Sequence, residues 1–157
     1  MREADRTEAE LIAGIVRDSF RTVAERFGLT AENCPRHPSN CTAEWVESEM
    51  DEGVRYFVLE DDDGPCGCVA LERRDAETCY LERLAVLPEH RHRGHGRALV
   101  QHALAEARRL GAERVELAMI AGDGRLRRWY EEFGFRLKET RTFDHLPFEV
   151  TFMGMEV

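Results

Sequence analysis

A basic, glycine-containing loop lies past the middle of this 157-residue chain, and its residue types suit the binding of an anion. The segment Arg91–Gly96 reads Arg-His-Arg-Gly-His-Gly, and Arg97 follows it. Gly94 and Gly96 have no Cβ, so the backbone can turn tightly there and approach a ligand closely. A helix that begins at Arg97 would point its unpaired first-turn N–H groups into the loop. These donors, the helix dipole and the arginines together predict a phosphate site.

The spacing of these glycines does not match the two commonest phosphate-binding motifs. A P-loop has four residues between its glycines, followed by Lys and then Ser or Thr. The dinucleotide motif needs a third glycine three residues after Gly96, where this chain has Leu99. The pattern Arg91–Gly96 instead resembles the acetyl-CoA loop of the GNAT acetyltransferase superfamily, Arg/Gln-x-x-Gly-x-Gly/Ala. A strand ending in Leu-Ala-Val-Leu-Pro-Glu, residues 84–89, leads into the loop as it does in that superfamily.

This resemblance implies a set of contacts to acetyl-CoA, which would serve as the co-substrate. The loop amides would hold the CoA pyrophosphate, and the preceding strand, splayed from the next one by a bulge, would hydrogen-bond the pantetheine arm. A backbone N–H of that strand would also stabilise the tetrahedral oxyanion. The residues that we assign to cofactor binding are Leu84, Ala85, Val86, Arg91, His92, Arg93, Gly94, His95, Gly96, Arg97, Asp123 and Tyr130.

A second motif of the superfamily begins at Tyr130. The sequence Tyr-Glu-Glu-Phe-Gly-Phe is similar to Tyr-Glu-x-x-Gly-Phe, in which the tyrosine lies beside the CoA sulfur. The resemblance makes Tyr130 the general acid toward the leaving thiolate, because a phenol with a pKa near ~10 stays protonated at neutral pH. The alternative is a core tyrosine on the apolar face of its helix. Two positions depart from the superfamily pattern: Asp123 replaces an asparagine, and Leu126 replaces an alanine.

Acetyl transfer to an amine also needs a base, because a lysine-like amine with a pKa near ~10.4 must lose a proton before it attacks. Glu82 is our candidate, since it is a charged residue in the otherwise apolar strand before the loop. In the polyamine acetyltransferases, a glutamate in a similar Tyr-Leu-Glu strand has this role and acts through water. The alternative is that Glu82 only forms an ion pair with Arg73, Arg74 or Arg83.

The remaining candidate residues belong to the acceptor side. In the superfamily the region of Cys34–Cys41 borders the acceptor pocket, and the last strand can line it; the alternative for residues 34–41 is a plain connection. His145, before the last strand, is an alternative base or else an ordinary turn histidine. The predicted substrate-binding residues are His37, Asn40, Tyr80, Glu82 and His145. Cys34, His37 and Cys41 have a spacing compatible with zinc, but no fourth ligand is local, so we expect no metal. The histidines around the basic loop (His90, His92, His95 and His102) are interpreted as donors on the phosphate side at most.

Length and composition favour one domain, residues 1–157, in a soluble globular protein. The chain is 43% hydrophobic and 34% charged, and it has no run of about eighteen apolar residues. The N-terminus lacks the apolar region of a signal peptide. Five cysteines, an odd number, favour reduced thiols and a cytoplasmic location.

Charge is distributed unevenly along the chain. The net charge of −9 makes nucleic acid an unfavourable partner. Residues 42–63 contain nine carboxylates and one arginine, a net charge of −8, whereas residues 88–128 contain nine arginines and five carboxylates, a net charge of +4. The basic part suits a phosphorylated cofactor, and the acidic part would attract a cationic acceptor. The alternative is that the acidic residues only keep the protein in solution.

Hydrophobic periodicity predicts a mixed α/β fold of the α+β type. Helices are expected at 7–27, at a short segment after Thr42, at 97–110 and around 126–133. Strands are expected at 54–60, 66–72, 77–87, 114–120, 135–142 and 148–155. This order implies a mixed sheet with helices on both faces. It is also the layout of the GNAT acyl-CoA N-acyltransferase fold, except that the first strand is short or missing.

We therefore expect an N-acetyltransferase that moves the acetyl group of acetyl-CoA to a primary amine by direct attack. A small cationic amine is the favoured acceptor, and a protein N-terminus or a lysine side chain comes next. No nucleic acid or membrane is expected as a partner, and a homodimer is possible. The alternative from another class is a CoA-binding regulatory or interaction module without turnover.

Overall fold

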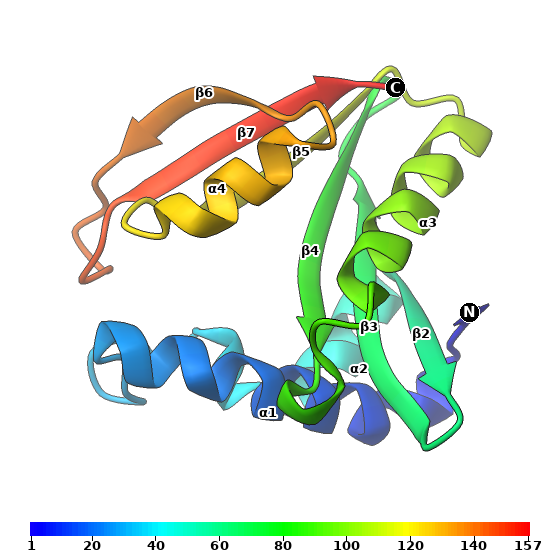
Figure 1. Ribbon diagram of the computed structural model, residues 1–157, viewed down its shortest axis with the longest axis horizontal. Coiled ribbons are helices and arrows are strands. Elements are labelled where there is room, and N and C mark those ends of the chain that lie inside the picture. The colour runs from blue at the N-terminus through cyan, green and yellow to red at the C-terminus, as the bar shows by residue number, and fades with distance from the viewer.

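Seven strands form one mixed sheet in the order β1-β2-β3-β4-β5-β7-β6. The computed structural model describes residues 1–157 and places helices on both faces of this sheet (Figure 1). The strands are β1 (Arg2–Glu3), β2 (Arg55–Asp61), β3 (Gly64–Arg73), β4 (Thr78–Val86), β5 (Arg114–Ile120), β6 (Arg136–Arg141) and β7 (Val150–Glu156). The helices are α1 (Ala9–Phe27), α2 (Ala43–Asp51), α3 (His95–Arg109) and α4 (Gly124–Glu131), with 3₁₀ turns η1 (Arg6–Glu8), η2 (Pro38–Asn40) and η3 (Pro88–His90). The predicted mixed sheet with helices on both faces is confirmed.

The first strand is short, as the sequence indicates. Only Arg2 and Glu3 pair with β2, opposite Val58 and Phe57. Asp5 and Glu8 then form a reciprocal capping box, in which each side chain accepts a hydrogen bond from backbone near the other. This cap turns the chain into η1, so α1 begins at Ala9 rather than at the predicted residue 7.

Two apolar clusters hold the helices on opposite faces of the sheet. On one face, Ile12 and Val16 of α1 and Val46 of α2 pack against Tyr56 and Val58 of β2. On the other face, α3 and α4 cover the sheet with residues that include Leu99, Val100 and Tyr130. The three- and four-residue spacing of these apolar positions is why each segment folds as a helix with one buried side.

Two boundaries differ from the prediction for local reasons. Helix α3 begins at His95, two residues early, because Gly94 takes the N-cap position with a left-handed φ of 83°. Strand β7 begins at Val150 rather than at residue 148. Phe148 instead packs with Leu146 on a small cluster around Ala24 and Leu29, at the end of α1.

The sheet divides at β4 and β5. These parallel strands pair only from Thr78 to Tyr80 and then separate, so the rest of β4 has no partner on that side. Along its other edge β4 bulges: the register with β3 shifts between Cys68 and Ala70, and Arg83 takes a left-handed φ of 52°. A bulge bends a strand and increases its twist. Figure 1 shows β5, β6 and β7 fanning away from β2 and β3, with β4 between the two groups.

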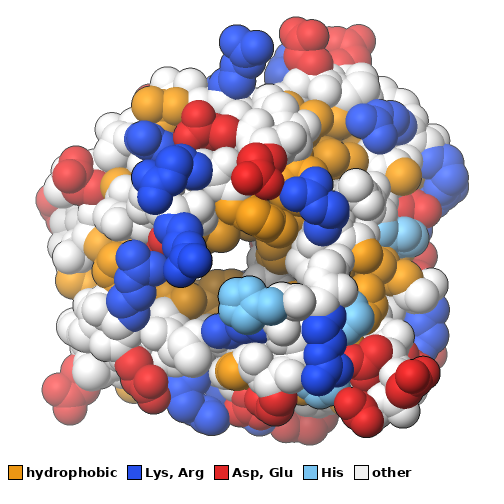
Figure 2. All heavy atoms as spheres, in the orientation of Figure 1, with side chains coloured by type: hydrophobic (Ala, Val, Ile, Leu, Met, Phe, Trp, Pro, Cys, Tyr) orange, Lys and Arg blue, Asp and Glu red, His pale blue; other side chains and the backbone are white.

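A hollow opens where the strands separate. Figure 2 shows it at the centre of the molecule, between α4, β4 and α1, with Lys and Arg side chains at its rim and hydrophobic side chains inside it. This hollow is the opening between β4 and β5. None of the helices has the length and apolar character that crossing a membrane requires.

Candidate active site

Six consecutive backbone N–H groups lie unpaired at the start of α3. Arg91 N–H donates to Pro88 O at 3.3 Å, and Ala98 N–H donates to Gly94 O at 3.1 Å. Between them, no N–H group from His92 to Arg97 donates a hydrogen bond within the chain. The left-handed φ angles of His92 (64°) and Gly94 (83°) curl the loop around these donors. A row of free amides at a helix N-terminus is an anion site, so the predicted phosphate cradle fits the loop.

The arginines of this loop are occupied by other protein groups. The guanidinium of Arg91 donates to Val86 O at 3.1 Å, to Thr22 Oγ1 at 3.1 Å and to Ser19 O at 2.7 Å. It therefore fastens the loop to β4 and α1. Arg97 pairs with Glu132 at 3.1 Å, on the surface. The backbone amides, more than the side chains, are the donors left for a ligand.

The strand predicted to hold the pantetheine arm borders the opening. Leu84, Ala85 and Val86 follow the bulge at Arg83, on the part of β4 that has lost β5 as a neighbour. Ala85 is buried toward α1, while Leu84 and Val86 pack toward α3. The separation of the strands leaves main-chain groups of this edge available to an extended ligand.

Glu82 lies just before the bulge, beside two charged neighbours. The pKa of Glu82 is raised to about 7, mainly by burial and next by the nearby carboxylate of Glu72. Arg74 pairs with both carboxylates, at 3.4 Å from Glu82 and 3.2 Å from Glu72. The ion pair of Glu82 with Arg74, which the sequence offered as the alternative to a catalytic role, is thus present. The carboxyl group of Glu82 still has the pKa of a base that works near neutral pH.

Tyr130 is a buried residue of α4. Its side chain is 6% exposed and packs edge-to-face against Trp129 and Phe135. Burial raises the pKa of its phenol well above the ordinary value, so the group is a proton donor at neutral pH. Besides burial, the charge of Asp123 raises this pKa, and no hydrogen bond to the hydroxyl contributes. The apolar surroundings match the core alternative, and the protonated hydroxyl is compatible with the proposed acid.

Asp123 has two structural partners. Its carboxylate accepts the Leu126 N–H at 3.2 Å as the N-cap of α4, and it pairs with Arg26 of α1 at 3.2 Å. An asparagine has the same capping ability but would lack the ion pair. Asp123, which replaces the asparagine of the superfamily pattern, therefore links α1 to α4 across the opening.

The predicted acceptor residues occupy different places. Tyr80 lies on β4 two residues before Glu82, with the guanidinium of Arg74 4.2 Å from its ring centre. His37 is buried, which lowers its pKa to about 4 and keeps it neutral. Asn40 donates to Cys34 O at 3.2 Å, so its amide braces the loop. His145 is exposed on the β6–β7 loop and contacts Phe143.

The zinc alternative at residues 34–41 has no converging ligands. His37 Nδ1 faces Ser39 Oγ at 2.7 Å, and Cys41 Sγ accepts from Arg83 at 3.4 Å. Cys34, His37 and Cys41 do not form a group whose ligand atoms lie within metal-binding range of one another.

The structure adds residues that the sequence did not indicate. Arg83 pairs with Glu49 of α2 at 3.2 Å, and its guanidinium lies 5.8 Å from the ring centre of Trp45. Strict alternation places Arg83 on the face opposite Glu82, and only the bulge brings both to the α2 side. Glu49 had a signal, because it is an acidic residue among the apolar positions of its helix.

Comparison with known proteins identifies the family. The model of the Acetyltransferase (GNAT) family matches residues 17–135, about three quarters of the chain. The chain belongs to the GNAT acetyltransferase family. An amino-acid acetyltransferase of Neisseria meningitidis serogroup A is 31% identical over 105 residues, which is 66% of this chain and 22% of the relative. This GNAT chain thus spans about a fifth of the length of that relative.

Solved structures show the same fold. The ribosomal-protein-S18-alanine N-acetyltransferase from Escherichia coli has a TM-score of 0.77 at 17% identity, covering 99% of this GNAT chain and 91% of that one. The PaiA N-acetyltransferase from Thermoplasma acidophilum, in complex with coenzyme A, has a TM-score of 0.75 at 17% identity over 99% and 97% of the two chains. The predicted fold and family are confirmed.

Proposed function

We propose that this GNAT protein transfers the acetyl group of acetyl-CoA to a primary amine. The observation that carries the proposal is the row of unpaired amides from His92 to Arg97, beside the opening between β4 and β5. The amides would bind the pyrophosphate, and the free edge of β4 would bind the pantetheine arm. Membership of the family supports the same reading.

The proposed chemistry uses two groups on either side of the opening. Glu82 would take a proton from the acceptor ammonium, directly or through water, since its pKa of about 7 suits a base at neutral pH. The neutral amine would attack the thioester carbonyl, and a β4 amide between Leu84 and Val86 would stabilise the oxyanion. Tyr130 would give its phenolic proton to the departing thiolate. The amine would attack the thioester directly, without a covalent acetyl-enzyme intermediate, because this order of steps needs no nucleophile from the protein.

The acceptor that we favour is a small cationic amine, followed by a protein N-terminus or a lysine side chain. Three carboxylates, of Glu49, Glu72 and Glu82, gather on the α2 side of β4. Arg74 and Arg83 pair with them, so the group has one negative charge in excess when all five are ionised. Such a lining attracts an ammonium group while it holds each carboxylate in place.

The test is acetyl-CoA binding by calorimetry to the wild type, Gly94→Asp and Gly94→Asn. Asp and Asn both tolerate the left-handed backbone of residue 94, and a Cβ there meets nothing within 4 Å. The two variants differ in one charge, which would lie among the free amides. We expect Asp to weaken binding on the order of tenfold more than Asn does.

A thiol-release assay over cationic amines, peptides and amino acids then tests turnover. Release of CoA thiol that depends on the amine supports the transferase. Tight binding without release would replace it with the non-catalytic CoA-binding module, and absence of binding by the wild type would overturn both.

A further inference from the structure

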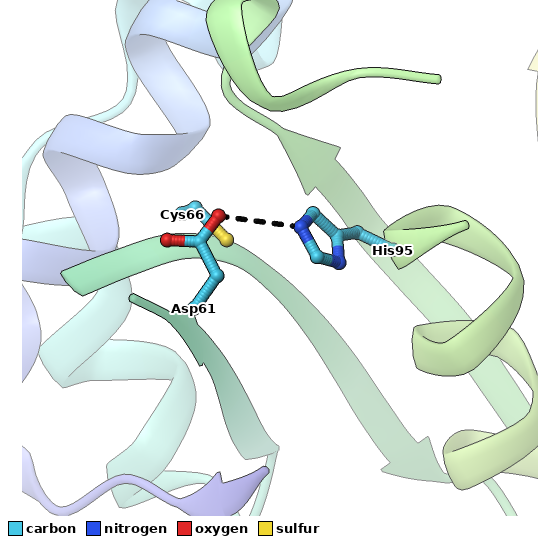
Figure 3. A group of neighbouring side chains, drawn as sticks. All are labelled: Asp61, Cys66 and His95. Carbon is cyan, nitrogen blue, oxygen red and sulfur yellow. Dashed lines mark ion pairs between the residues drawn. The ribbon is translucent and has the colours of Figure 1, made fainter. Parts of the chain in front are cut away.

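A mixed cluster of metal-binding side chains lies beside the loop of unpaired amides. We call this loop, residues 90–97, the anion loop. Asp61 at the end of β2, Cys66 in β3 and His95 at the start of α3 bring an oxygen, a sulfur and a nitrogen within 4.8 Å of one another (Figure 3). A second group, Asp61, Asp63 and His90, is equally close and shares Asp61 with the first. These residues come from the β2–β3 hairpin and from both ends of the anion loop.

Burial makes this cluster unlike a chance group of surface residues. Cys66 is fully buried, and the side chains of Asp61, His90 and His95 are 15%, 13% and 18% exposed. His95 Nε2 is a buried atom without a hydrogen-bond partner, although Asp61 Oδ2 lies 3.3 Å away. A buried polar atom of this kind calls for an explanation, and a bound cation would satisfy it.

The geometry suits a tetrahedral ion. With metal–ligand bonds of ~2.0–2.1 Å for nitrogen and oxygen, two ligand atoms of a tetrahedron lie about 3.3–3.4 Å apart. The separation of Asp61 Oδ2 and His95 Nε2 already has this value. Figure 3 shows the imidazole of His95 pointing at the carboxylate, with the sulfur of Cys66 beside it. Thiolate, imidazole and carboxylate together are a ligand set that zinc accepts.

We propose that Asp61, Cys66, His95 and His90 bind one Zn²⁺ ion, which fastens the anion loop to the β2–β3 hairpin. His90 now contacts Asp61 Oδ2 at 2.7 Å and would move to the fourth position. The thiol proton of Cys66 would pass to solvent, and both imidazoles would bind in neutral form. One carboxylate and one thiolate then balance the charge of the ion.

Binding of the ion would also change the loop itself. The guanidinium of Arg93 lies 3.6 Å from the carboxylate of Asp61, and the side chain of Arg93 is half-exposed. A metal on Asp61 would displace this guanidinium and leave it free to face an anion in the loop. His90 and His95 precede and follow the loop centre, so the ion would hold both ends of the loop. This site goes beyond the proposed function and does not depend on acetyl transfer.

The experiment is a titration of the chelator-treated protein with Co²⁺, which replaces zinc and reports its ligands by absorption. We expect one equivalent to bind, with a thiolate-to-cobalt charge-transfer band and the strong visible bands of tetrahedral Co²⁺. Cys66→Ala should abolish the charge-transfer band, whereas Cys79→Ala, a change at another buried cysteine, should keep it. His95→Asn should weaken binding at least ~tenfold, whereas His92→Asn on the exposed neighbour should not.

Folding of each variant is checked by circular dichroism before the titration. If Cys66→Ala does not fold, Asp61→Asn keeps the side-chain volume and serves in its place, with binding expected to weaken. Zinc should raise the melting temperature of the wild type and of Cys79→Ala, and at the same zinc concentration it should raise that of His95→Asn less. Absence of a saturable single site, or a spectrum that is the same in Cys66→Ala as in Cys79→Ala, would overturn the proposal.

Discussion

At the scale of single residues, the decisive feature is a glutamate with a raised pKa. Glu82 would be an ordinary ionised carboxylate if it were only the partner of Arg74. Burial and the carboxylate of Glu72 oppose the arginine and raise the pKa to about 7. A carboxyl group of this kind can accept a proton from an amine and release it to water at neutral pH.

The pH dependence of the reaction follows from this value. A base acts only when deprotonated, so kcat/KM for acetyl transfer should rise as the pH passes through about 7. Glu82→Gln should lower kcat at least ~100-fold and remove this limb of the profile. Steady-state rates between acid and alkaline pH provide the measurement.

Glu72→Gln is the matched control for this prediction. It removes the neighbouring negative charge and leaves Glu82 in place, so the limb should move to lower pH because the pKa of Glu82 falls. A Glu82→Gln enzyme that kept both its rate and its pH profile would exclude Glu82 as the base.

At the scale of elements, close contact between β3 and β4 supports the bulged strand. Gly67 of β3 is opposite Val86, next to the bulge. A Cβ at Gly67 would lie 2.9 Å from the carbonyl oxygen of Ala85 and 3.1 Å from Leu99 of α3. Only a residue without a side chain lets the strand and the helix approach the end of β4 this closely.

Gly67→Ala should therefore destabilise the fold. Because the nearest atom is a backbone oxygen that cannot turn away, the strand must shift, and we expect the free energy of unfolding to fall by about 1–3 kcal/mol. Gly14→Ala in α1 is the control, since a Cβ there meets only Arg17 at 3.8 Å. It should be neutral or stabilising by up to about 1 kcal/mol. Urea unfolding measures both, and equal stability of the two variants would contradict the packing argument.

At the scale of the whole molecule, charge is distributed unevenly along the chain. Residues 42–63, which span α2 and β2, contain nine carboxylates and one arginine, while the anion loop, α3 and α4 contain eight of the 21 arginines and only two carboxylates, Glu106 and Glu131. Figure 2 shows Lys and Arg side chains at the rim of the central hollow. A phosphorylated ligand would enter on the positive side, although the molecule has a net charge of −9.

Acetyl-CoA binding should therefore weaken as salt is added. From dilute buffer to ~1 M salt the Debye length falls to ~3 Å, which screens the attraction between the basic segment and the phosphates. Calorimetry at several salt concentrations measures the change in Kd. Dephospho-coenzyme A has one phosphate fewer, so its Kd should depend less on salt. If the Kd of acetyl-CoA did not change with salt, uncharged contacts would account for the binding.

The sequence by itself determined the elements and the anion loop. Apolar periodicity is a local property, so the helices and strands were predictable to within a few residues. The pattern Arg91–Gly96 also acts locally, because two glycines and a following helix suffice to leave amides unpaired. The expectation of a short or missing first strand came from the resemblance to the GNAT layout, and β1 has only two residues.

Only the tertiary structure decided how distant residues meet. The bulge at Arg83 moves a side chain to the other face of the sheet, and it is a feature of the pairing of β4 with β3. The pKa of Glu82 depends on Glu72 and on burial, which no single segment contains. The group of Asp61, Cys66 and His95 joins residues up to 34 positions apart. Burial and charge act through space, so neighbours in the chain cannot reveal them.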